Sequence, residues 1–153
     1  MFKFFIFFPF LLLSSEFFIL PDDNMHLNNN IEISIKKAKK HIYIFTKNIN
    51  NYTLNKSLTS TAKTGIKIDL ITSPKNLKDK ASYLSIFNNI NVYTLNTNTD
   101  IKGSLICIDK DNFFFLSQTL DAKELNTNVS FAIHIKQNCK KRFEILLKRS
   151  NKY

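Results

Sequence analysis

The segment His41–Thr46 constrains the fold of this chain more than any other. It reads His-Ile-Tyr-Ile-Phe-Thr, so both sides of an extended strand would be largely apolar. Such a strand suits the centre of a sheet that helices cover on both faces. Apolar residues recur at helical steps on either side of it: Leu27, Ile31, Ile35 and Ala38 before, and Leu54, Leu58 and Ala62 after. The pattern predicts a helix, a central strand and a second helix.

The rest of the sequence predicts an α/β domain with a mixed β-sheet flanked by helices. We expect Asp22 and Asp23 to cap the first helix, Pro74 to open a third helical stretch and a basic helix to end the chain. A turn signal at 110–112 predicts a hairpin. The two hairpin strands are expected at 104–108 and 113–116. The other expected strands are 16–20, 66–72, 92–95 and 129–135. A length of 153 residues fits one domain, which we assign to residues 16–153.

The first 15 residues have the layout of a secretory signal peptide. Lys3 supplies a positive charge, residues 4–13 are apolar, and Ser14 and Ser15 are small. The apolar stretch is shorter than the roughly 20 residues that span a membrane. We therefore expect a periplasmic or secreted protein, cleaved near Ser15. An uncleaved membrane anchor is the alternative, because apolar residues resume at Phe17.

Charge and cysteine content leave the partner open. The net charge of +10 is compatible with nucleic acid or anionic phospholipid, but a solvated lysine-rich surface accounts for it equally well. Cys107 lies in an apolar run, and Cys139 is expected on the apolar face of the last helix. An exported protein could join the two, yet two separate buried thiols are the preferred interpretation. No spacing resembles a metal site, and no cofactor is implied.

Two stretches resemble a known family. Residues 31–46 and 58–70 resemble the opening helix–strand pairs of phospholipase D-like domains. That family carries a motif of His, any residue, Lys, four residues, Asp, six residues, Gly, Gly or Ser, any residue and Asn. With the hairpin fixing the alignment, Lys102 stands at the His position, Ser104 at the Lys position and Asp109 at the Asp position. Placing Asp100 at the His position would keep a Lys but leave the spacing to Asp109 two residues too long.

The second half of the motif is also altered. Leu116 replaces Gly, Ser117 matches, Thr119 replaces Asn, and Asn128 stands where many members have Glu. The resemblance implies a phosphodiesterase superfamily fold in which Lys102, Ser104, Ser117 and Thr119 are the candidate phosphate-binding residues.

The resemblance implies a reaction that this sequence is poorly equipped to perform. In active members the His attacks a phosphodiester, Lys and Asn hold the phosphoryl oxygens, and Asp orients the His. A lysine side chain is ordinarily protonated near neutral pH, so Lys102 is a poor nucleophile but a plausible phosphate ligand. We assign no catalytic role to His26, His41 or His134, because the residues around each of them fit a surface or strand-edge position.

Single-motif members of the family pair two subunits, so the resemblance also implies a homodimer. Three functions stay open: a non-hydrolytic module that binds nucleic acid or phospholipid, an active phospholipase D or nuclease with altered residues, and a structural or partner-binding domain.

Overall fold

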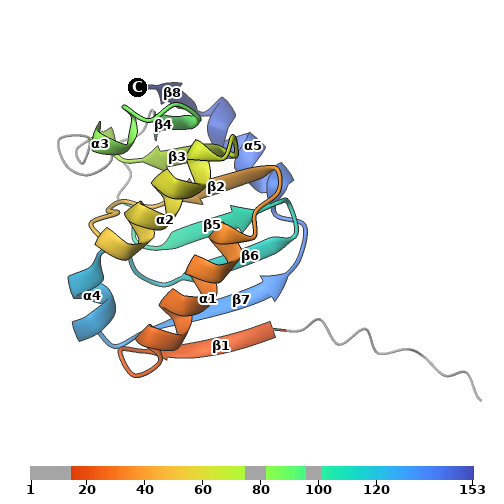
Figure 1. The fold of residues 1–153 in the computed structure, drawn as a ribbon. Coiled ribbons are helices and arrows are strands. Elements are labelled where there is room, and N and C mark those ends of the chain that lie inside the picture. The colour runs from red at the N-terminus through yellow and green to blue at the C-terminus, as the bar shows by residue number, and fades with distance from the viewer. Residues whose placement is uncertain (1–14, 75–81, 96–100) are drawn as a thin grey trace, which may run out of the picture.

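A computed structural model describes residues 15–74, 82–95 and 101–153. Its centre is one eight-stranded sheet in the order β1-β7-β6-β5-β2-β3-β4-β8 (Figure 1). Strands β2, β3 and β4 run parallel, and the other neighbours pair antiparallel. The sheet is therefore mixed, and the predicted α/β class is confirmed. The strands are β1 Ser15–Leu20, β2 His41–Phe45, β3 Lys67–Thr72, β4 Ile90–Leu95, β5 Ser104–Ile108, β6 Asn112–Leu116, β7 Ser130–Lys136 and β8 Ser150–Lys152.

The main core lies between one face of the sheet and the helices α1 (Asn24–Lys36) and α2 (Tyr52–Lys63). Leu27, Ile31 and Ile35 are buried at the helical steps that the sequence predicts. The N-cap of α1 differs from expectation. Asp23 stands at that position, but its carboxylate makes no capping bond and instead accepts a hydrogen bond from the backbone N of Ile19, 2.8 Å away.

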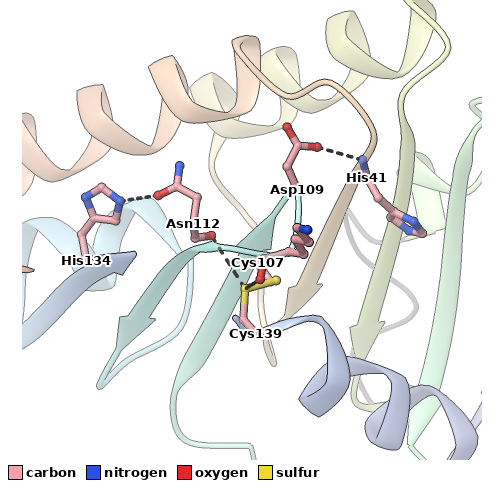
Figure 2. Close-up of a disulfide and its surroundings, with 7 residues drawn as sticks. His41, Cys107, Asp109, Asn112, His134 and Cys139 are labelled. Atoms are coloured by element: carbon pink, nitrogen blue, oxygen red, sulfur yellow. Dashed lines mark hydrogen bonds between the residues drawn. A yellow bond between two sulfur atoms is a disulfide. The ribbon is translucent and has the colours of Figure 1, made fainter. Parts of the chain in front are cut away.

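A smaller core forms on the opposite face, where α5 (Lys140–Lys148) packs. Phe143 is fully buried there against Tyr43, Ile71 and Cys107. The preferred interpretation of two separate thiols is wrong, because Cys107 and Cys139 form a disulfide. Cys139 is the N-cap residue of α5 rather than part of its apolar face, so the bond ties the start of this helix to the last residues of β5, at Cys107 next to Ile108 (Figure 2).

The remaining elements follow the predicted order with two differences. The third helical stretch is described only as α3 (Ser82–Leu84), and residues 75–81 lie outside the described chain. Strand β8 was not expected, since Ser150–Lys152 is short and polar. Helix α4 (Ala122–Thr127) links β6 to β7. Residues 1–14, which carry the expected signal segment, also lie outside the described chain. None of the described helices is long and apolar enough to cross a membrane.

Candidate functional site

The motif positions around Ser104 come together at one edge of the sheet, where β5 begins and β2 and β6 end. Ser104 is the first residue of β5 and pairs with Leu116, the last residue of β6. Leu105 pairs with Phe45, so Thr46 leaves β2 at the same edge. We call this the motif edge: Thr46, Lys102–Ser104 and Ser117–Asp121.

Ser104 is fully buried and hydrogen-bonded within the protein. Its Oγ lies 2.7 Å from Oγ1 of Thr46, which is also fully buried. Thr46 donates its only hydroxyl proton to the carbonyl of Asn48 and accepts from the backbone N of Leu120. Ser104 must therefore be the donor to Thr46. Both hydroxyls hold the loops of the motif edge together, and neither faces solvent.

Thr119 is likewise engaged. Its Oγ1 donates to Glu124 and accepts from the backbone N of Asp121. The Asp121 carboxylate caps α4 by accepting from the backbone N of Lys123 and of Glu124, and it also accepts from Asn48 Nδ2 at 3.1 Å. Two carboxylates therefore stand beside the position where the family motif has Asn, which makes the local charge less favourable for a bare phosphate.

Lys102 is the exposed cation of the motif edge. Gly103 follows it, and a Cβ there would lie 2.8 Å from the backbone O of Leu116. Only glycine fits this approach without a backbone shift, so the start of β5 is held tightly against β6 while the Lys102 side chain is left in solvent. Ser117 Oγ accepts from the backbone N of Phe131 and extends the pairing of β6 with β7.

Asp109 is not at the motif edge. It follows β5 at the opposite end, about 16 Å along the strand from Ser104 at 3.3 Å per residue. Its carboxylate accepts from the backbone N of Lys39, Lys40 and His41 at 2.7, 2.7 and 3.1 Å. The residue has a positive φ of 53°, a conformation that Asp tolerates better than most residues. In this structure Asp109 fastens the hairpin to the loop before β2 (Figure 2).

The histidines lie away from the motif edge. His134, in β7, contacts Glu16 and Asn112 and stacks on Phe114, and Figure 2 shows it beside Asn112. His26 is exposed in α1 next to Phe18. His41 begins β2 at the far end of the sheet. The described residues thus place no imidazole beside Ser104 or Thr119.

His41 belongs to a polar cluster that the sequence analysis missed. Its Nε2 lies 2.8 Å from a carboxylate oxygen of Asp69, and Asn91 donates to the other oxygen at 2.9 Å. Burial by itself raises the pKa of Asp69, but the hydrogen bonds from His41 and Asn91 and the charge of Lys67 outweigh it and lower the pKa below its ordinary value. The only sequence signal is polar residues on one face of three adjacent strands.

Gln118 is the second residue that was missed. It is only 7% exposed, and neither its Oε1 nor its Nε2 has a hydrogen-bond partner. Ser130, the first residue of β7, also has an unpartnered buried hydroxyl. A buried amide without partners is costly, so Gln118 is a weak point of the motif edge. In the described part of the chain, no group of three or more His, Cys, Asp or Glu side chains could hold a metal ion.

Comparisons with known proteins identify the architecture. No protein-family profile and no curated protein matches the sequence. Among solved structures, NucT from Helicobacter pylori superposes with a TM-score of 0.83 at 16% identity, over 92% of this chain and 99% of that one. Nuc from Salmonella typhimurium, a phospholipase D family member, superposes with a TM-score of 0.72 at 16% identity, over 92% and 97% of the two chains. TrmBL2, an archaeal chromatin protein with a novel mode of DNA binding, gives 0.66 at 13% identity, over 95% of this chain and 57% of that one.

Proposed function

Since the chain has the phospholipase D/nuclease fold, we propose that it is an exported, non-hydrolytic protein of this fold that binds nucleic acid at the motif edge. The observation that carries the proposal is the state of Ser104. At the position of the motif Lys stands a fully buried hydroxyl that donates to Thr46, while the only exposed charge of the motif positions is Lys102.

The chemistry of the motif edge argues against hydrolysis. Covalent phosphodiester cleavage needs a nucleophile and a group that protonates the leaving oxygen. Ser104 has no base within the hydrogen-bond network described above, since its partner Thr46 gives its own proton to a backbone carbonyl. Asp109 is bound to three backbone amides at the other end of β5. Loss of such groups typically removes factors of 10² to 10⁴ in rate for each.

The same edge is suited to contacting a polyanion. Lys102, before β5, and Lys123, in the first turn of α4, are both exposed, and the chain as a whole carries a net charge of +10. Cations of this kind bind backbone phosphates without reading sequence. The carboxylates of Asp121 and Glu124 oppose this attraction, but hydrogen bonds from Asn48, Thr119 and the start of α4 partly offset their charge. TrmBL2, an archaeal chromatin protein with a novel mode of DNA binding, is similar to this chain over 57% of its own length, which supports nucleic acid as the ligand.

Export and dimerisation are part of the proposal. The N-terminal segment has the layout of a signal peptide, and the Cys107–Cys139 disulfide is stable in oxidising compartments and rare in the cytosol. The two observations are independent. The homodimer rests on the family resemblance, and a dimer that brought two Lys102 side chains together would favour an anion between them.

Salt-dependent binding of a fluorescent oligonucleotide tests the proposal. The Lys102→Ala variant is expected to weaken binding and reduce the slope of log K against log salt by about 1. Lys141→Ala removes the same charge from an exposed site on α5 and is expected to leave the slope unchanged. Equal effects of the two variants would show that the oligonucleotide responds to the net charge of the protein and has no binding site at Lys102. Binding to anionic vesicles that depends on Lys102, with no binding to the oligonucleotide, would assign a phospholipid ligand instead.

A further inference from the structure

One half of the sheet has an apolar face that no described helix covers. On this face β1 presents Phe17 and Ile19, which are 62% and 53% exposed, whereas Phe18 and Leu20 alternate with them into the main core. Helix α5 packs over the neighbouring half, around Tyr43 and Ile71. The uncovered half lies on the far side of the sheet from α1 (Figure 1).

The register of the strands makes this face continuous. Phe17 pairs with Ile133, which pairs with Phe115, and Ile19 pairs with Phe131. Phe131 is 40% exposed and stacks with Phe17, their ring centroids 6.0 Å apart. We call these five residues, together with Ile135 on the same face, the apolar face; Phe113, next to them on β6, packs instead against the core that α5 covers. The charged residues of β1 and β7, Glu16 and Lys136, alternate onto the opposite side of the sheet.

An exposed apolar surface of this kind marks an interaction site. We propose that the apolar face contacts the surface of an anionic lipid bilayer. The sequence immediately before β1 favours this occupant over a protein. Residues 4–13 are apolar and end two positions before Ser15, the first residue of β1. A segment of this length is too short to span a bilayer comfortably, and one weak apolar attachment is insufficient for stable membrane binding.

The apolar face supplies the second attachment, and the net positive charge draws the protein toward anionic lipid. We take the N-terminal segment as retained, the uncleaved alternative given above, so that an attachment ending just before Ser15 brings the edge strand β1, with Phe17 and Ile19, to the bilayer surface. Phenylalanine rings partition readily into the acyl boundary below the headgroups. The net charge of +10 attracts the chain to anionic headgroups before the rings insert.

The absence of tryptophan provides a sharp test in the full chain. Single-tryptophan variants Phe17→Trp and Phe131→Trp report from the apolar face, and Tyr52→Trp reports from an 81% exposed position on α2. With phosphatidylglycerol vesicles that contain bromine-labelled acyl chains, we expect quenching of tryptophan at positions 17 and 131 and none at position 52. The double variant Phe17→Ser/Phe131→Ser should lower vesicle affinity on the order of 100-fold, while Tyr52→Ser should not.

Three results would overturn the proposal. The first is vesicle binding without quenching at positions 17 and 131, which would assign binding to the N-terminal segment alone. The second is no vesicle binding. The third is an emission at position 131 that is blue-shifted without lipid and moves to longer wavelength when the protein is diluted to the monomer, which would show that a second copy covers the face. Circular dichroism of each variant establishes that it is folded.

Discussion

Reduction of the Cys107–Cys139 disulfide should destabilise the domain by about 4 kcal/mol. The bond closes a loop with a sequence separation of 32 residues. In the chain-entropy description such a loop removes about 12 cal/mol/K from the unfolded state, or about 3.7 kcal/mol at 25 °C. Reduction leaves both sulfur atoms in place, so no cavity opens around Cys107, which is fully buried. The change in stability therefore reports the link between β5 and the start of α5.

Urea unfolding followed by far-UV circular dichroism, with and without dithiothreitol, measures this change. For a slope of about 2 kcal/mol/M, the midpoint should fall by about 2 M. Protein made in an oxidising compartment and unfolded without reductant should take up no thiol label, whereas prior reduction should expose two thiols. Labelling of two thiols in unreduced protein, or identical midpoints under both conditions, would refute the reasoning.

Three further predictions concern polar side chains whose structural roles the contacts define. Asp109→Ala leaves three backbone amides without their acceptor and should cost about 3 kcal/mol in urea unfolding, while Asp109→Asn, which keeps an acceptor and tolerates the positive φ, should cost about half as much; equal losses would contradict this role. Because the pKa of Asp69 is lowered in the folded state, its contribution is present above the unfolded pKa of about 4 and is lost as the pH falls through the folded value. Thermal unfolding of Asp69→Asn between pH 5 and 2 should therefore show a smaller acid loss than the wild type, and parallel curves would count against it. Gln118→Leu removes an unpartnered buried amide and should change stability by no more than about 1 kcal/mol, in the stabilising direction if the pocket accepts the side chain; a loss above about 2 kcal/mol in the same assay would reveal a polar partner.

The fold was predictable because its signals are periodic. The doubly apolar strand His41–Phe45 and the helical steps at Leu27, Ile31 and Ile35 follow directly from burial on the two faces of a sheet. Strand β8 was missed because its three residues, Ser150–Lys152, are polar, and as an edge strand it pairs only with β4. Backbone pairing at the edge of a sheet needs no apolar pattern, so the sequence of that segment does not predict a strand.

The site was less predictable because it depends on contacts between distant residues. Spacing aligned Ser104 and Asp109 with one motif, but only the structure shows that Ser104 is paired with Thr46 and that Asp109 binds backbone amides at the far end of the strand. The disulfide could not be inferred from two cysteines that both lie in apolar surroundings. The predicted phosphate-binding roles of Lys102, Ser104, Ser117 and Thr119 stay predictions. The geometry favours Lys102 among them, because the hydroxyls of the other three are hydrogen-bonded within the protein.

Non-hydrolytic binding of nucleic acid is tested by incubating the protein with a labelled oligonucleotide and reading both binding and strand length from the same sample. A native gel reports the complex, and a denaturing gel of the same aliquot reports cleavage. We predict a salt-sensitive complex that requires Lys102 and contains oligonucleotide of full length after prolonged incubation. Shortened products that disappear in the Lys102→Ala variant would contradict it, because they would show that the altered motif still hydrolyses phosphodiesters.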